Sequence, residues 1–127
     1  MATGPQGPRR KMLLVVDDDP DVRESIFQVL TEAGYDVSGA GDGKEALDKL
    51  LHGRRPDLII LDLRMPRKSG HEVLEALRES PSYVGIPVVV LSAYLNFPPS
   101  GAVAWLKKPV QPSTLVSVVN EYAPLGS

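Results

Sequence analysis

The chain of 127 residues contains no cysteine. A disulfide framework and a thiolate metal site are therefore excluded, which fits a cytoplasmic protein. No apolar run approaches the roughly 18 residues that a membrane-spanning helix needs. The apolar stretch Met12–Val16 is also too short for the core of a signal peptide. The sequence thus predicts neither a membrane span nor a secretion signal.

The chain also lacks a strong excess of charge of one sign. Its 14 Lys and Arg residues nearly balance its 16 Asp and Glu residues, giving a net charge of −2. Direct binding to nucleic acid or to a membrane is not expected, because either would need a clustered basic face. The one basic cluster, Arg9 to Lys11, is short, and we interpret it as a solvated entry to the fold.

A chain of this length can bury roughly two thirds of its unfolded surface in one core. We expect a disordered N-terminal tail over residues 1–10, one domain over 11–123 and a C-terminal tail over 124–127. The first eight residues are rich in Gly and Pro, which favours the absence of regular structure there.

Four apolar runs each end in a charged or hydroxyl residue. The runs and the residues that follow them are Leu13–Val16 with Asp17 and Asp18, Leu58–Leu61 with Asp62, Val88–Leu91 with Ser92, and Val103–Leu106 with Lys107 and Lys108. Such runs are typical of parallel strands buried on both faces. Ligands bind at the carboxyl ends of these strands, so carboxylates, a hydroxyl and an ammonium should meet at one edge.

Strand-like and helix-like segments alternate along the chain. The expected strands are Met12–Val16, Asp36–Ala40, Leu58–Asp62, Ile86–Leu91 and Val103–Leu106. The expected helices run from Pro20 to about Ala33, from Asp42 to near Leu51, from Ser69 to about Glu79 and from Pro112 to about Tyr122. This alternation predicts an α/β fold with a doubly wound, five-stranded parallel sheet in the flavodoxin-like order 2-1-3-4-5.

Each polar residue at a strand end has a structural and a chemical interpretation. Asp17, Asp18 and Asp19 could serve simply to cap the first helix, or they could supply the oxygen ligands that Mg²⁺ prefers. Asp62 could form a turn, or it could be a nucleophile that accepts a phosphoryl group. Ser92 and Lys108 could likewise be a turn hydroxyl and a solvated lysine, or they could bind phosphoryl oxygens. The placement of all of them at the same end of the sheet favours the chemical interpretation.

At these residues the chain resembles the receiver domain of two-component response regulators. The similarity covers about Lys11 to Tyr122 and rests on four motifs, which are LLVVDDDP over 13–20, LDLRMP over 61–66 with Gly70, VLSA over 90–93, and KKP over 107–109. The resemblance implies a phosphoprotein of signal transduction that catalyses only its own phosphotransfer and autodephosphorylation, and is otherwise no enzyme. Its partners would be a sensor histidine kinase or phosphotransfer protein and a downstream effector protein or domain.

The resemblance also implies roles for individual residues. Asp62 would be the phosphoacceptor, Asp18 and Asp62 direct Mg²⁺ ligands together with the Arg64 carbonyl, and Asp17 a ligand through water. Ser92 and Lys108 would bind the phosphoryl oxygens, and the bond before Pro109 would be cis. Arg64 and Tyr94 would flank the path of the hydrolytic water, where their bulk should slow dephosphorylation.

The chain departs from the family at the fifth strand. The aromatic switch position corresponds to Trp105, where Tyr or Phe is usual, so Trp105 is either a switch or a residue packed on an edge strand. Val110 replaces another position that is often aromatic.

The chain departs further between the fourth and fifth strands. Ser92 and Lys108 are only 16 positions apart, with Pro98, Pro99 and Gly101 in the interval. Proline disfavours helix, so the fourth helix is expected to be missing or reduced to one turn, with residues 94–101 crossing as a loop. Tyr94, Leu95, Phe97 and Trp105 would then cover the core or meet a partner, and any homodimer would use an atypical interface.

Other classes fit the sequence less well. A pseudo-receiver, which binds partners without phosphorylation, would be expected to lack the acidic pair, the acceptor or the lysine. A haloacid-dehalogenase-type phosphatase needs a second aspartate where this chain has Arg64, and a flavin carrier would not place three aspartates in its phosphate loop. The pathway, and whether the domain acts alone or as a fragment of a longer regulator, are left open.

Overall fold

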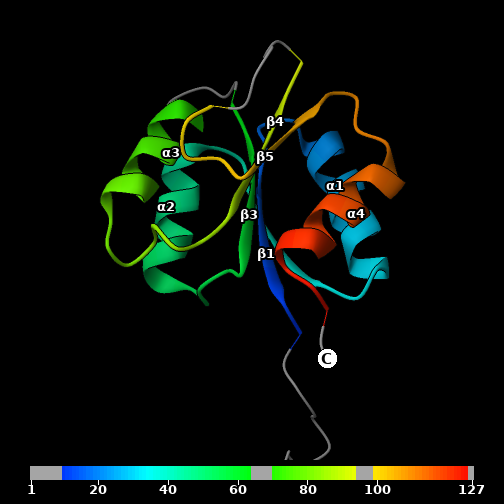
Figure 1. Ribbon diagram of the computed structural model, residues 1–127, viewed down its shortest axis with the longest axis horizontal. Helices are drawn as coiled ribbons and strands as arrows, with labels where there is room; N and C mark the ends of the chain where they lie inside the picture. The colour runs from blue at the N-terminus through cyan, green and yellow to red at the C-terminus, as the bar shows by residue number, and fades with distance from the viewer. Residues whose placement is uncertain (1–9, 64–69, 94–98, 126–127) are drawn as a thin grey trace, which may run out of the picture.

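The computed structural model describes residues 10–63, 70–93 and 99–125. These residues form a five-stranded parallel sheet in the order β2-β1-β3-β4-β5, as predicted. Helices α1 and α4 cover one face of the sheet and α2 and α3 cover the other (Figure 1). The described residues contain four helices, and none of these is long and apolar enough to cross a membrane.

The five strands lie at or within two residues of their predicted positions. They are β1 (Met12–Val16), β2 (Asp36–Ala40), β3 (Leu58–Asp62), β4 (Val88–Ser92) and β5 (Ala104–Lys107). The central strands β3 and β4 are buried throughout, whereas the edge strands β2 and β5 are mostly half-buried. Four predicted boundaries were wrong, because β4 was expected over Ile86–Leu91 and β5 over Val103–Leu106. Ile86 is buried in the turn that precedes β4, and Val103 precedes β5.

The helices are α1 (Pro20–Glu32), α2 (Gly43–His52), α3 (Gly70–Glu79) and α4 (Pro112–Tyr122). Asp19 caps α1, because its Oδ1 accepts hydrogen bonds from the amides of Asp21 at 2.9 Å and Val22 at 3.4 Å. The α1 helix is followed by Gly34, whose φ of 112° lies in the left-handed region that favours glycine.

Asp42, with which the second helix was predicted to start, is the N-cap of α2. Its Oδ1 accepts from the Glu45 amide at 2.8 Å. In a capping box the Glu45 side chain would accept from the amide of the N-cap, Asp42. Here it accepts instead from the amide of the preceding residue, Gly41, at 2.7 Å. The predicted first residue of α3, Ser69, lies outside the described residues.

Two apolar clusters hold the layers together, one on each face of the sheet. The cluster between the sheet and α1 with α4 includes Leu13, Leu30, Tyr35, Ile60, Leu91 and Val119. The cluster between the sheet and α2 with α3 includes Leu14, Leu50, Ile59, Leu61, Leu74 and Leu77. Burial of this alternating strand surface on both faces is the main stabilising contribution to such a fold.

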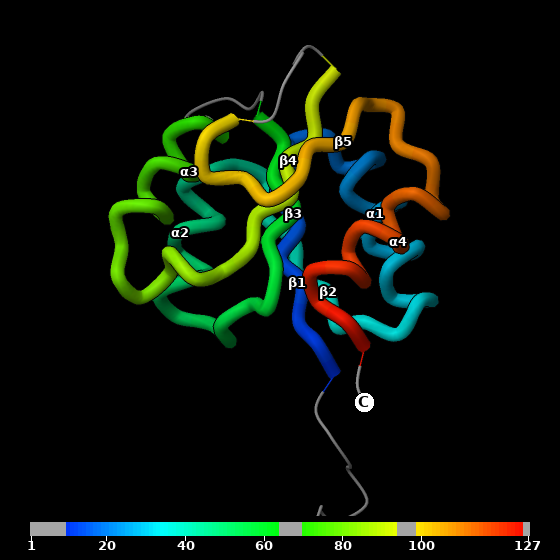
Figure 2. The backbone as a smooth tube through the Cα atoms, in the orientation of Figure 1, coloured from blue at the N-terminus to red at the C-terminus, as the bar shows by residue number. Residues whose placement is uncertain are grey.

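The connection between β4 and β5 contains no helix over its described part, residues 99–103. A turn forms there, in which the Ala102 amide donates to the Pro99 carbonyl at 3.2 Å. This segment lies on the side of the sheet covered by α2 and α3 (Figure 2), and Ala102 packs against their apolar cluster. The prediction of a loop over 94–101 therefore holds for 99–101, while 94–98 lie outside the described residues.

Candidate functional site

Polar side chains lie at the same end of four neighbouring strands of the sheet. Asp17 follows β1, Asp62 ends β3, Ser92 ends β4 and Lys108 follows β5. The parallel register pairs Val16 with Leu61 and Asp62 with Leu91, which brings the strand ends level. A hollow of about 420 Å³ opens there, lined by Asp17, Asp18, Asp19, Asp62, Ser92, Ala93 and Lys108.

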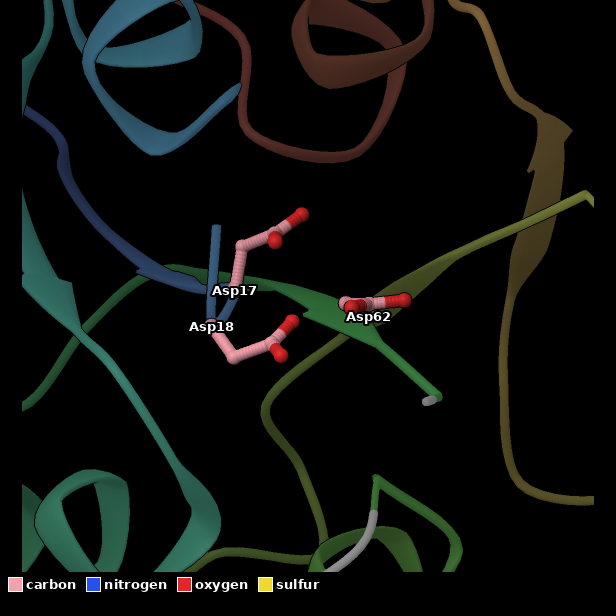
Figure 3. A group of neighbouring side chains, drawn as sticks. All are labelled: Asp17, Asp18 and Asp62. Atoms are coloured by element: carbon pink, nitrogen blue, oxygen red, sulfur yellow. The ribbon is translucent and has the colours of Figure 1, made fainter. Parts of the chain in front are cut away.

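Three carboxylates cluster in this hollow. Asp17 and Asp18 extend from the chain that follows β1, and Asp62 extends from the end of β3 (Figure 3). Each offers an oxygen that lies within 4.8 Å of the others. Asp17 is 0% exposed and Asp62 4%, whereas Asp18 is exposed. Like charges this close repel one another, so the cluster favours a bound cation.

Lys108 forms ion pairs with two of these carboxylates. Its Nζ lies 2.9 Å from Asp17 Oδ2 and 3.5 Å from Asp62 Oδ1. Burial alone would lower the pKa of Lys108, but the hydrogen bond and charge of Asp17, with the smaller effect of Asp62, raise that pKa above its usual value. The ammonium therefore stays charged at neutral pH. The Lys108–Pro109 peptide bond is cis, as the resemblance implied.

The backbone around Asp17 holds its side chain in place. The Asp17 amide donates to the Ala40 carbonyl at 3.0 Å, and the Asp19 amide donates to Asp17 Oδ1 at 2.9 Å. Arg23, one turn into α1, donates from Nη1 to the Asp17 carbonyl at 2.6 Å. No sequence pattern pointed to this arginine, because many helices carry an arginine in their first turns without any role at a site.

Gly70, at the start of α3, lies against the backbone of the candidate acceptor. A Cβ at this position would come within 2.3 Å of the Asp62 carbonyl oxygen and 2.6 Å of the Leu63 Cα. The Gly70 amide donates to the Leu63 carbonyl at 3.2 Å. Only glycine lets α3 begin this close to Asp62.

The remaining predicted site residues fall into two groups. Ser92 is 4% exposed and lines the hollow with Asp62. Arg64 and Tyr94, as well as Leu95 and Phe97, lie outside the described residues. Ser92 thus joins the acidic cluster and Lys108 at one place, as the strand-end pattern predicted.

Trp105 is half-buried on β5 and packs against the apolar cluster of α2 and α3. Its indole Nε1 is buried and has no hydrogen-bond partner among the described residues. The indole thus contributes to the core on the face that the loop over 99–103 also covers. A switching role of Trp105 stays a prediction.

An apolar hollow of about 570 Å³ adjoins the site, between α1 and the segment that leads into α4. Its apolar walls include Val22, Ile26, Pro109, Val110 and Leu115, and Lys108 lines it as well. Sequence reasoning missed this hollow, because its walls come from α1, the end of β4, the segment 108–110 and α4, which meet only in the fold.

Residues 13–120 match the response regulator receiver domain family. This chain belongs to that family. The receiver is 38% identical over 116 residues to the DNA-binding response regulator MtrA of Mycolicibacterium smegmatis, covering 87% of this chain and 49% of MtrA. It is 37% identical to an uncharacterised 14.6 kDa protein of Leptolyngbya boryana, covering 87% of this chain and 88% of that protein.

Solved structures give the same assignment. The chemotaxis response regulator CheY4 of Vibrio cholerae is 34% identical, with a TM-score of 0.82 over 90% of this chain and 99% of CheY4. The receiver thus spans nearly all of some relatives and about half of others, such as MtrA.

Proposed function

We propose that this receiver accepts a phosphoryl group on Asp62 from a histidine kinase or phosphotransfer protein, in a Mg²⁺-dependent reaction, and thereby switches its contacts with a downstream effector. The observation that carries the proposal is the position of the Asp62 carboxylate. It is nearly buried, grouped with Asp17 and Asp18, and 3.5 Å from the Lys108 ammonium. We place this reaction in the cytoplasm.

Asp62 would act as the nucleophile. One of its carboxylate oxygens would bond to the phosphorus of a phosphohistidine as the bond to the imidazole nitrogen breaks, leaving an acyl phosphate on Asp62. The approaching group is an anion, and three carboxylates repel it. A Mg²⁺ ion bound to this oxygen-only set would neutralise that repulsion and polarise the phosphoryl oxygens.

The donor set fits this ion. Asp18 and Asp62, with the Arg64 carbonyl, are the proposed direct ligands, and Asp17 the ligand through water. Asp17 Oδ2 is engaged by Lys108 and its Oδ1 by the Asp19 amide, which supports an indirect role for Asp17. Asp18 is the exposed member and keeps a carboxylate available to a metal.

Lys108 and Ser92 would hold the new phosphoryl oxygens. Lys108 lies between Asp17 and Asp62, so its ammonium can hold a phosphoryl group on Asp62 without leaving the site. Ser92 reaches the same hollow from the end of β4, the strand that pairs directly with β3. The resemblance to receivers makes Ser92 and Trp105 the proposed switch residues, and they lie on the two strands beyond β3, which carries Asp62.

The apolar hollow beside Lys108 supports a protein as the phosphodonor. It opens next to the reacting group, and its half-buried wall residues Val22, Val29 and Val110 are side chains that an amphipathic helix can cover. A helix seated there would bring a histidine on its surface to the edge of the acidic cluster. A small phosphodonor would not need such a surface.

Substitution of Asp62 by Asn tests the proposal. The amide keeps the shape of the carboxylate but is a poor nucleophile, so phosphorylation by a small phosphodonor with Mg²⁺ should be abolished in Asp62→Asn. Asp48→Asn, an exposed carboxylate on α2, is the matched control and should be labelled as wild type is. Labelling is followed by intact-protein mass spectrometry. Mg²⁺-dependent labelling of Asp62→Asn would move the acceptor elsewhere, and an unlabelled wild type would favour the pseudo-receiver, which binds partners without phosphorylation.

The lifetime of the acyl phosphate tests the tuning residues. We propose that Arg64 and Tyr94 exclude the hydrolytic water by their bulk, so Tyr94→Ala should speed dephosphorylation several-fold. The decay of phosphorylated protein after removal of the donor measures this rate. An unchanged or slower rate would reject the steric argument, and Tyr122→Ala, at the far end of α4, serves as the aromatic control.

A further inference from the structure

A second charged hollow lies at the opposite end of the sheet, where β1 and β3 begin, at the lower end of Figure 1. We call it the basal hollow. Its volume is about 410 Å³, and its lining residues are Arg10, Lys11, Arg54, Arg55 and Asp57. The basic entry that the sequence indicated at Arg10 and Lys11 is thus joined by two arginines from the segment between α2 and β3.

Backbone carbonyls hold the guanidinium groups of Arg54 and Arg55 in place, and each group keeps N–H donors that are not used in these bonds. Arg54 donates to the Arg10 carbonyl and pairs with Asp36 at 3.1 Å, and Arg55 donates to the Ser82 carbonyl. A guanidinium has five N–H donors, so each retains several for another acceptor. Counting the paired Asp36 with the five lining residues, the hollow has four cations and two carboxylates, a net charge of +2.

The Asp57 carboxylate is already engaged. Its Oδ2 accepts a hydrogen bond from the Met12 amide at 2.8 Å. Asp57 therefore fixes the start of β1, and its charge is already included in the net +2 of the hollow. The basal hollow keeps its positive potential.

An apolar ledge adjoins this hollow. Leu51 at the end of α2 is 65% exposed and Val84 in the turn before β4 is 59% exposed, the two highest values among the large apolar side chains of the described residues. Their segments are tied together, because the Tyr83 hydroxyl donates to the Leu50 carbonyl at 3.2 Å. The bond of Arg55 to Ser82 links the ledge to the hollow.

We propose that the basal hollow and the Leu51/Val84 ledge form a docking surface for an acidic protein segment with an apolar side chain between its carboxylates. The forked guanidiniums of Arg54 and Arg55 match the geometry of carboxylates, and the ledge takes the apolar side chain. A free phosphate would leave the ledge uncovered. A flat anionic bilayer fits poorly, because the surface is concave and includes Asp36 and Asp57.

This surface lies at the other end of the strands from Asp62. Docking there leaves the acidic hollow open, so a partner could hold the receiver in either phosphorylation state. The inference thus does not depend on the proposed phosphotransfer, and the variant Asp62→Asn should bind the acidic segment as wild type does.

The test uses a peptide of sequence EELEEL, blocked at its ends and labelled with fluorescein, together with the chain of 127 residues. We expect fluorescence anisotropy to show binding that weakens at high salt. Backbone amide shifts should change at residues 10–11, 51–55 and 82–85. The peptide QQLQQL should not bind, and EESEES should bind several-fold more weakly.

Single substitutions divide the surface into its parts. Arg55→Gln should weaken EELEEL binding by about tenfold, which is the usual effect of losing one charge-assisted hydrogen bond. Leu51→Ser should weaken the binding several-fold, because it removes apolar contact area. Lys44→Gln, an exposed cation at the start of α2, is the control and should change nothing. All three positions are exposed, so melting temperatures near that of wild type will show that the fold is kept.

Several results would overturn the proposal. These are the absence of EELEEL binding, equal binding of QQLQQL or EESEES, and shifts confined to other residues. Tripolyphosphate that binds the Leu51→Ser variant and wild type equally, and displaces EELEEL at similar concentrations, would show a simple anion site. Phosphatidylglycerol vesicles that bind tightly when the peptide does not would show a lipid surface.

Discussion

At the carboxyl end of the sheet the charged side chains are crowded and two of the carboxylates, Asp17 and Asp62, are buried, whereas at the amino end the charged side chains are spread apart and none of the lining residues is buried. The Lys108–Asp17 pair at the carboxyl end has side-chain exposures of 25% and 1%. The Arg54–Asp36 pair at the amino end has exposures of 29% and 46%. The acidic cluster packs three carboxylates within 4.8 Å, and the basal hollow anchors its guanidiniums on separate carbonyls.

This difference explains which end can act as a switch. Charges that repel one another in a buried place store free energy, which a cation or a new phosphoryl group changes on binding. Exposed charges with separate partners are screened by solvent and gain or lose little. We therefore expect changes at the carboxyl end to alter stability and state, and changes at the basal end to alter binding alone.

The largest expected difference is between two glycine substitutions. Gly70→Ala would force a Cβ to 2.3 Å from the Asp62 carbonyl oxygen, and because backbone cannot yield as a side chain can, the free energy of unfolding should fall by about 3 kcal/mol. In Gly85→Ala, beside the basal ledge, the new Cβ would meet only Arg55 Nη2, at 3.8 Å. The free energy of unfolding should therefore change by less than about 0.5 kcal/mol. Urea unfolding measures both. Equal losses would contradict the close approach of α3 to Asp62.

The next largest difference is between the two ion pairs. Lys108→Met leaves the buried Asp17 carboxylate without its cation, so we expect a loss of about 2 kcal/mol in the absence of Mg²⁺. Arg54→Met removes a pair in which neither partner is buried, and it should cost less than about 1 kcal/mol. Thermal unfolding compares them. A Lys108→Met variant as stable as Arg54→Met would mean that the acidic cluster does not depend on the lysine.

The apolar runs of the sequence predicted the centre of the fold well, because a strand buried on both faces admits only apolar residues. Leu58–Asp62 and the strand order followed from that rule. The edge strand β5 was predicted one residue early, since its half-buried residues constrain the sequence less. Pro98, Pro99 and Gly101 predicted the lack of a helix after β4, which the described residues 99–103 bear out.

The sequence also predicted which residues meet at the site, but not how they contact one another. Strand ends in a parallel sheet must meet, so Asp17, Asp62, Ser92 and Lys108 could be grouped without coordinates. The pairing of Lys108 with Asp17 at 2.9 Å depends on side-chain geometry that no residue spacing encodes. The basal hollow was missed for a similar reason, because Arg54 and Arg55 lie more than 40 positions from Arg10 and meet it only in the fold.

The smallest expected effect concerns Mg²⁺ without phosphorylation. Binding to the native state alone stabilises it by about 1.4 kcal/mol at a free concentration ten times Kd, which for a domain of this size raises Tm by about 5 °C. Asp18→Asn removes the exposed carboxylate of the cluster, so without Mg²⁺ this variant should melt at or above the temperature of wild type, because one repulsive charge is gone. With Mg²⁺ the order should reverse. Asp48→Asn should follow wild type in both conditions, since its carboxylate lies on α2 outside the acidic hollow. If wild type and Asp18→Asn melt at the same temperatures with and without the ion, the acidic end does not hold the metal, and the contrast between the two ends of the sheet would rest on Lys108 alone.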